Sequence, residues 1–92
     1  MASCAPETVI RIVERILELP EVAPDAALAL SMDTTAEWDS LRHLQIMFAI
    51  EAAFGLFVEP EDAIRLTSVR AIVEFVGRKL AGAGRGPGSI VP

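Results

Sequence analysis

The sequence contains few of the residues that build metal or disulfide sites. Its 92 residues include one cysteine, one histidine and no tyrosine. The single Cys4 cannot form an internal disulfide, and one histidine with one remote cysteine gives too few ligands for a zinc site. We therefore expect no bound metal, an incidental thiol at Cys4, and the reducing cytoplasm as the cellular setting.

Positive charge and long apolar runs are also scarce. Eight Lys and Arg face 13 Asp and Glu, which gives a net charge of −5. Phosphate backbones would be repelled, so nucleic acid is not an expected partner. The apolar runs are too short to span a membrane, and the opening MASCAPET lacks the basic and apolar regions of a signal peptide. This balance favours a soluble protein that meets basic protein surfaces.

Aliphatic residues are plentiful, and their spacing predicts helices. Hydrophobic residues make up 52% of the chain and aromatic residues 5%, so aliphatic side chains must build the core of one domain. Two stretches have the spacing of amphipathic helices. They are Val9, Ile12, Val13, Ile16 and Leu17, and Val69, Ile72, Val73, Val76 and Leu80. Pro20 should end the first helix, and Thr67 or Ser68 should cap the last.

Three further segments lie between these helices. Residues 20–38 form a long connection with room for one helical turn near 25–30. A helix is expected from Ser40 to about Phe54, capped by Asp39 or Ser40 and ended by Gly55. A short helix should run from Pro60 to about Leu66.

The predicted fold is all-α. It is a small bundle of three main helices plus one short helix, with a long loop between helices one and two. These elements form one domain, residues 1–81, and the glycine-rich segment 82–92 is predicted to be a flexible C-terminal tail.

The helix from Ser40 to Phe54 is apolar on nearly every side. One stripe holds Leu44, Met47, Ile50 and Phe54, and another holds Leu41, Phe48 and Ala52 beside Gln45, while Ile46, Ala49 and Ala53 lie between them. A bundle of this size cannot bury both stripes. One of them should therefore face solvent and bind a partner.

Ser40 has three possible roles. It could be a helix cap worth about 1 kcal/mol. It could be a nucleophile with His43, which lies three residues later, but W-D-S-L-R is not a G-x-S-x-G elbow and no oxyanion donors surround it. We expect His43 to be a surface residue and the protein not to be an enzyme. The third role is an attachment point for a non-protein group, with partners docking along the helix that follows.

These residues resemble the acyl and peptidyl carrier proteins. The motif D-S-L stands at 39–41, E-x-x-F-G follows at 51–55, and T-S-V at 67–69 opens the last helix, so the resemblance covers about residues 7–80. It implies that a separate phosphopantetheinyl transferase attaches 4′-phosphopantetheine from coenzyme A to Ser40, flanked by Asp39 and Leu41. The thiol of this arm then holds acyl or aminoacyl groups as thioesters.

The resemblance also implies which stripe faces outward. The partner-binding residues would be Leu41, Arg42, Gln45, Phe48, Glu51 and Ala52, and the core residues Leu44, Met47, Ile50 and Phe54. The implied partners are an acyl- or aminoacyl-loading ligase and downstream synthase or transferase enzymes, which act on a monomer.

Two departures from fatty-acid carriers favour a discrete carrier of a polyketide, nonribosomal-peptide or other specialised lipid pathway. Arg42, His43 and Gln45 stand where that type is rich in acids, and Trp38 precedes D-S-L. We expect Trp38 to anchor the long loop by packing on the helix. The alternative is a carrier-like helical adaptor in which Ser40 stays unmodified and only protein contacts matter.

Overall fold

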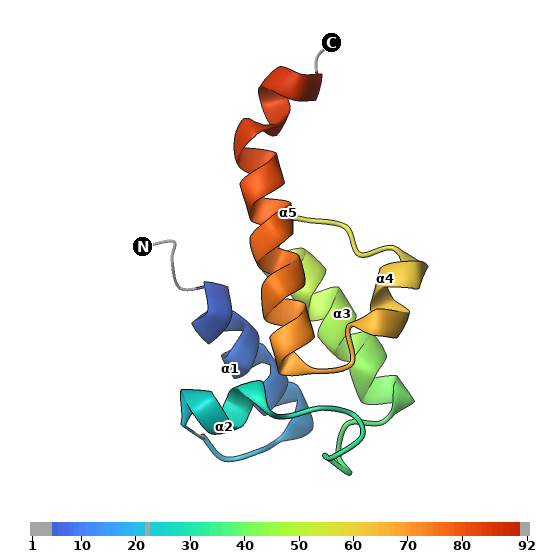
Figure 1. The fold of residues 1–92 in the computed structure, drawn as a ribbon. Coiled ribbons are helices and arrows are strands. Elements are labelled where there is room, and N and C mark those ends of the chain that lie inside the picture. The colour runs from blue at the N-terminus through green and yellow to red at the C-terminus, as the bar shows by residue number, and fades with distance from the viewer. Residues whose placement is uncertain (1–4, 22, 91–92) are drawn as a thin grey trace.

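Five helices account for nearly all the regular structure. The computed structural model describes residues 5–21 and 23–90, with side chains described at 5–21, 23 and 25–81. The helices are α1 (Ala5–Leu17), α2 (Pro24–Leu28), α3 (Ser40–Phe54), α4 (Pro60–Arg65) and α5 (Val69–Ile90) (Figure 1). Within those ranges the only β pairing is an isolated bridge between Ser31 and Ser68. The all-α prediction is confirmed.

The helices pack around α1, which contacts α3, α5 and α2. The first helix ends where Glu18 takes a left-handed backbone conformation (φ 58°) and the Leu19 N–H donates to the Glu14 carbonyl at 2.9 Å. This closure precedes Pro20, as the sequence predicts. In the described part of the chain, no helix is long and apolar enough to cross a membrane. Cys4 lies outside the described residues.

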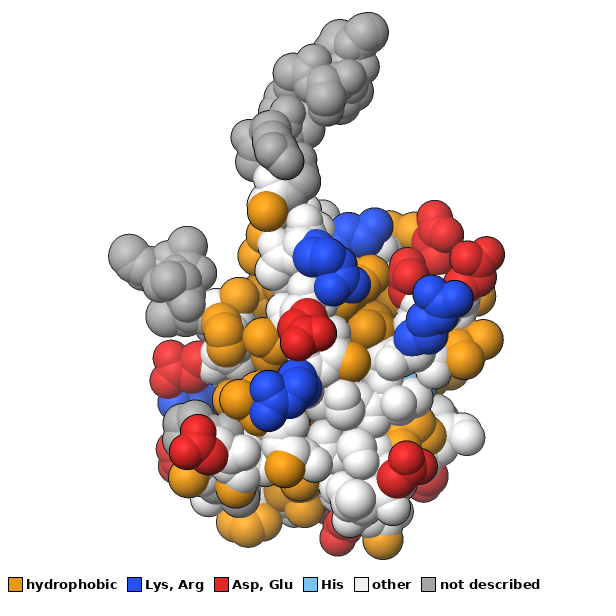
Figure 2. All heavy atoms as spheres, in the orientation of Figure 1, with side chains coloured by type: hydrophobic (Ala, Val, Ile, Leu, Met, Phe, Trp, Pro, Cys, Tyr) orange, Lys and Arg blue, Asp and Glu red, His pale blue; other side chains and the backbone are white. Residues whose placement is uncertain are grey.

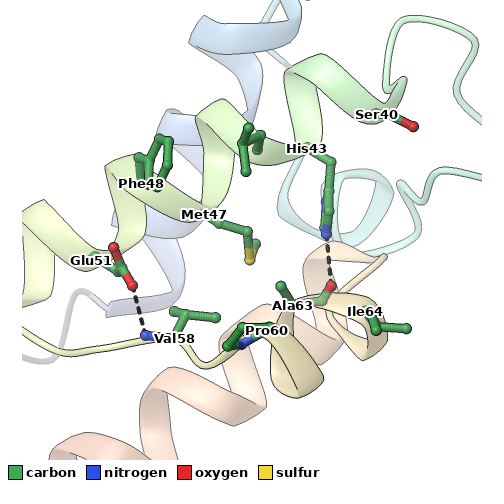
Figure 3. A pocket seen from close by; sticks show the side chains of 10 residues that line it. Ser40, His43, Met47, Phe48, Glu51, Val58, Pro60, Ala63 and Ile64 are labelled. Atoms are coloured by element: carbon green, nitrogen blue, oxygen red, sulfur yellow. Dashed lines mark hydrogen bonds between the residues drawn. The ribbon is translucent and has the colours of Figure 1, made fainter.

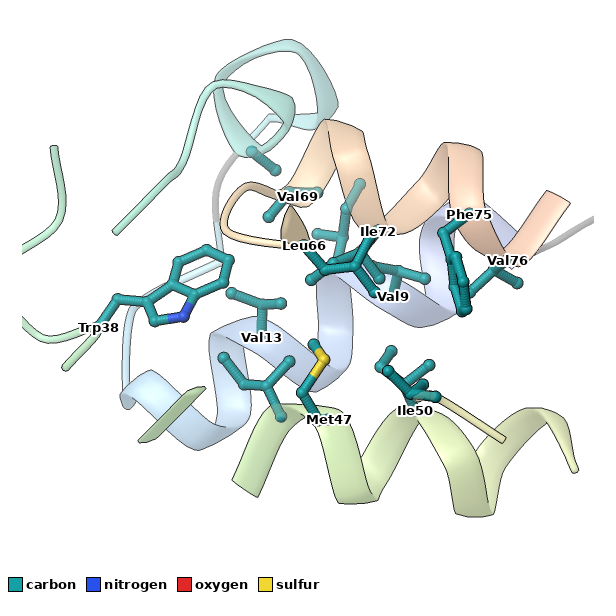
Figure 4. Close-up of a cluster of buried hydrophobic side chains, with 14 of the residues drawn as sticks. Val9, Val13, Trp38, Met47, Ile50, Leu66, Val69, Ile72, Phe75 and Val76 are labelled. Carbon is teal, nitrogen blue, oxygen red and sulfur yellow. The ribbon is translucent and has the colours of Figure 1, made fainter. Parts of the chain in front are cut away.

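The core is aliphatic, with one large exception. Side chains from α1, α3 and α5 interdigitate in it (Figure 4), and those with no exposed surface include Val9, Val13, Ile46, Ile50, Ile72 and Val76. Trp38, at the end of the long loop, is 2% exposed and is the largest fully buried side chain. Its predicted role as a loop anchor is confirmed. Burying an aromatic side chain of this size stabilises the fold by several kcal/mol, on the order of 25 cal/mol per Å².

The rotation of α3 differs from the prediction. Ile46, Met47 and Ile50 are buried, while Leu44, predicted to lie in the core, is 50% exposed. Phe54 is partly buried against the core. The side of α3 that packs on the bundle is thus centred on Ile46 and Ile50, one turn apart. Hydrophobicity alone could not set this rotation because α3 is apolar on nearly every side.

The other predicted stripe of α3 faces solvent. Leu41 and Phe48 are largely exposed, and Gln45 and Ala52 are exposed too. Their predicted exposure is confirmed. We call these four residues the outer stripe.

The long loop is tied to the start of α5. The Met32 N–H donates to the Thr67 carbonyl at 2.9 Å, and the Val69 N–H donates to the Leu30 carbonyl at 3.0 Å. Ser68, rather than Thr67, caps α5, because its Oγ accepts from the Ala71 N–H at 3.1 Å. These bonds hold the loop against the bundle and deliver Trp38 to the core.

The last helix continues into the glycine-rich segment. The sequence predicts a flexible tail from residue 82, and in the structure α5 continues through this segment to Ile90 and extends away from the other four helices (Figure 1). The domain boundary at 81 and the flexibility of residues 82–92 stay predictions.

Candidate functional site

Ser40 is the first residue of α3, and Asp39 caps the helix. The Asp39 Oδ1 accepts a hydrogen bond from the Arg42 N–H at 2.9 Å, with the Asp39 backbone extended. Ser40 is exposed, and its hydroxyl makes no hydrogen bond to any residue that the structure describes. Of the two cap candidates, Asp39 is therefore the cap. The Ser40 hydroxyl is left available.

The start of α3 is a suitable place for a phosphate group. Among the described residues, nothing accepts a hydrogen bond from the backbone N–H groups of Ser40 and Leu41. Free N–H groups and the positive end of the helix dipole stabilise an anion at this position. The hydroxyl of Ser40 lies at the same end of the helix.

Arg42 is not a free surface charge. Its Nη1 donates to the Ile16 carbonyl at 3.0 Å, which is one of the last carbonyls of α1. The side chain is partly buried and joins the start of α3 to the end of α1. Its predicted part in partner binding remains a prediction.

His43 bridges the long loop and α4. The Trp38 Nε1–H donates to His43 Nδ1 at 3.0 Å, so Nδ1 is an acceptor. The proton of the imidazole is then on Nε2, which donates to the Ala63 carbonyl at 2.8 Å (Figure 3). We call this pair of bonds the His43 bridge. The expectation that His43 is a surface residue is wrong, because the ring is partly buried and both nitrogens are engaged.

The His43 bridge also bears on the nucleophile hypothesis. A general base needs a free nitrogen within hydrogen-bond reach of the hydroxyl that it activates. Both nitrogens of His43 already bond to Trp38 and Ala63. The arrangement therefore does not support a Ser40–His43 catalytic pair.

Glu51 explains part of the E-x-x-F-G motif. Its Oε2 accepts from the Val58 N–H at 2.8 Å, which fixes the segment after α3 (Figure 3). Gly55 has a left-handed backbone (φ 63°), and its N–H donates to the Glu51 carbonyl at 2.9 Å. The motif therefore turns the chain from α3 toward α4.

We expect Glu51→Ala to lower the free energy of unfolding by about 1–3 kcal/mol, because it leaves the backbone N–H of the buried Val58 without its charged acceptor. Urea denaturation would measure the loss. Glu51→Gln keeps a side-chain oxygen and should lose less than half as much. Equal losses in the two variants would show that this hydrogen bond does not fix the segment.

An apolar groove begins beside Ser40 and runs between α3 and α4. Its volume is about 410 Å³. The lining residues are Ser40, His43, Leu44, Met47, Phe48, Glu51, Val58, Pro60, Ala63 and Ile64 (Figure 3). We call it the Ser40 groove. Most of its lining is hydrophobic, so it suits an apolar chain better than a polar ligand.

This groove is not apparent from the sequence. The sequence places Leu44 in the core and indicates no role for Ile64, which is an exposed residue of α4. One signal was present, since Ile64 is apolar in a helix with acids at Glu61 and Asp62. Six residues are too few for a periodic pattern to show which side of α4 faces α3.

The surroundings of the groove are unevenly charged. Acidic side chains gather over the α4 region in Figure 2, where Glu59 and Glu61 are exposed. On α3 itself the ionisable side chains Arg42, His43 and Glu51 are all hydrogen-bonded within the protein. The outer stripe therefore presents a largely uncharged surface, and the α4 region beside it carries both acids and the exposed Arg65.

Comparison with known proteins adds independent information. No protein-family model matches the chain. The acyl carrier protein of Thermosynechococcus vestitus (strain NIES-2133 / IAM M-273 / BP-1) is 30% identical to it over 61 residues, which is 66% of this chain and 70% of that protein. Among the described residues, no group of three or more His, Cys, Asp or Glu side chains is placed to hold a metal ion.

Proposed function

The chain belongs to the acyl carrier protein family, and on that basis we propose that Ser40 carries a 4′-phosphopantetheine arm. The single observation that supports Ser40 most strongly is its exposed hydroxyl at the first position of α3, which bonds to no described residue and lies beside two backbone N–H groups that also have no described partner. Asp39 meets the capping requirement, so modification of Ser40 would not cost the helix its cap.

The residues of this chain fit such a group. The Ser40 Oγ would form the new bond to phosphorus as coenzyme A loses its nucleotide part, and a separate phosphopantetheinyl transferase would take the hydroxyl proton. The free N–H groups in the first turn of α3 would then donate hydrogen bonds to the phosphodiester. When bound, the arm supplies a thiol that holds acyl or aminoacyl groups as thioesters.

An apolar acyl group on the arm would bind in the Ser40 groove. It begins at the attachment residue and is lined largely by hydrophobic side chains, among them Leu44, Met47 and Ile64. Removing apolar surface from water would stabilise the cargo there by roughly 0.8 kcal/mol per buried methylene. The same burial would keep water from the thioester.

The outer stripe is the proposed contact for partner enzymes, with Arg42 and Glu51 at its edges. These partners would be the transferase, a loading ligase for acyl or aminoacyl groups, and downstream synthase or transferase enzymes. Because Arg42 and Glu51 are bonded within the protein, the contact would depend on apolar area at Leu41 and Phe48 more than on ion pairs. The protein itself would perform no catalysis and would act as a cytoplasmic monomer.

The uncharged outer stripe also favours a specialised polyketide, nonribosomal-peptide or lipid pathway over the fatty-acid type, whose second helix is rich in acids.

A second candidate function is an adaptor in which Ser40 stays unmodified and the outer stripe binds proteins directly. The exposure of Leu41 and Phe48 supports it equally well.

Intact mass after incubation with a broad-specificity phosphopantetheinyl transferase and coenzyme A distinguishes the two. We expect the wild type to gain the mass of one phosphopantetheine and Ser40→Ala to gain none. Ser68→Ala is the matched control, since Ser68 also stands at a helix start but is committed to capping α5. No gain in the wild type, while a known carrier is modified in the same mixture, would favour the adaptor.

A further inference from the structure

The wall of the Ser40 groove formed by α4 is weakly held by packing. None of the six residues of α4 is buried. Its neighbours Val58 and Leu66 are buried, and within α4 only the partly buried Ala63 packs against the core. A segment with so little buried surface opens at a lower free energy than the core helices.

Two hydrogen bonds join α3 to this wall. Glu51 Oε2 accepts from the Val58 N–H at 2.8 Å, before α4 begins. His43 Nε2 donates to the Ala63 carbonyl at 2.8 Å, within α4 itself. Ser40 and His43 both line the groove at the start of α3, so the second bond is the one beside the attachment residue (Figure 3).

The orientation of His43 is imposed by the core. Trp38 is buried in the core, and its indole N–H donates to Nδ1 of the imidazole. The two ring centroids are 6.1 Å apart with the planes tilted by 33°. This contact fixes the ring and leaves the proton on Nε2, which is the state that can donate to Ala63. Through the His43 bridge, the buried side chain of Trp38 therefore helps to determine where α4 lies.

We propose that His43 is a positioning residue that holds α4 against α3 and so sets the width of the Ser40 groove beside Ser40. The part of the proposal that concerns cargo rests on the proposed function. The part that concerns α4 does not, because it requires no modification of Ser40. A groove held at a fixed width would favour slender, unbranched acyl chains over bulky ones.

Amide hydrogen exchange of the unmodified protein tests the position of α4. Loss of one hydrogen bond in His43→Leu should raise exchange in residues 60–66 by about three- to tenfold. Trp38→Phe, which removes the indole donor, should raise exchange in the same residues. His43→Gln, which keeps an amide donor, should restore much of the protection.

Arg42→Leu is the matched control. Arg42 is a neighbouring, partly buried residue that donates to the carbonyl of Ile16 on α1. Its loss should raise exchange near residues 16–19 and leave residues 60–66 unchanged. Unchanged exchange at 60–66 in His43→Leu, or an equal rise in Arg42→Leu, would overturn the proposal.

The cargo part is tested with octanoyl-phosphopantetheine, transferred from octanoyl-coenzyme A. We expect hydroxylamine to cleave the octanoyl thioester about three- to tenfold faster in His43→Leu than in the wild type, matching the change in α4 opening. Ser68→Ala, which removes the cap of α5 and lies outside both the groove lining and the outer stripe, should keep the wild-type rate. Equal rates in His43→Leu and the wild type would overturn the control of the groove by His43. Failure of loading in every variant would contradict the proposed function and leave the exchange result intact.

Discussion

Replacement of Trp38 by alanine is expected to lower the free energy of unfolding by about 3–5 kcal/mol. The side chain is 2% exposed and is the largest in the core, so its removal leaves a cavity that the surrounding aliphatic residues cannot fill. The change also removes the indole N–H that donates to His43 Nδ1, and it frees the loop that leads into α3. Since small domains are stable by roughly 5–15 kcal/mol, this loss would remove a large share of the total stability.

Urea denaturation followed by circular dichroism would measure this loss. Phe57→Ala is the matched control, because Phe57 is an aromatic side chain that is 65% exposed. Its truncation should change the free energy of unfolding by less than about 0.5 kcal/mol. Comparable losses in Trp38→Ala and Phe57→Ala would contradict the assignment of Trp38 as the anchor of the loop.

Replacement of Phe48 by glutamate is expected to leave the fold intact and to weaken transfer between the carrier and its partner enzymes at least tenfold. Phe48 is 59% exposed in the middle of the outer stripe. A charge there costs the free protein little, but it must lose its water when an apolar partner surface covers it. The expected penalty is about 2 kcal/mol or more, typical of a central contact residue.

The adjacent residue supplies the control. Met47 is buried, so Met47→Glu should unfold the protein rather than act on binding. For Phe48→Glu, thermal unfolding and the rate of transferase modification at limiting carrier concentration should be measured together. A large loss of stability would show that Phe48 supports the core. Unchanged stability with an unchanged rate would show that partners do not use the outer stripe.

The local features of the site were largely predictable from sequence. The limits of α3 at Ser40 and Phe54, the cap near Asp39 and the left-handed Gly55 follow from residue preferences that act over four or five positions. The start of α4 at Pro60 follows from the same kind of preference. These signals do not depend on how the helices pack.

The contacts that define the groove were not predictable in this way. Arg42 binds a carbonyl 26 residues away, and His43 binds one 20 residues away. Sequence spacing contains no information about such pairs until the helices are arranged in space. The rotation of α3, which exposes Leu44 and buries Ile46, was undetermined for a related reason, because either side of the helix is apolar enough to face the core.

The central claim is that Ser40 is the attachment residue of a carrier protein. Tandem mass spectrometry of peptides from the transferase-treated wild type tests it most directly. The account predicts that the phosphopantetheine mass is found on the peptide that contains Asp39-Ser40-Leu41, and that fragment ions assign it to Ser40. Assignment of the mass to another serine or threonine, or its absence from every peptide while a known carrier is modified in parallel, would contradict the account.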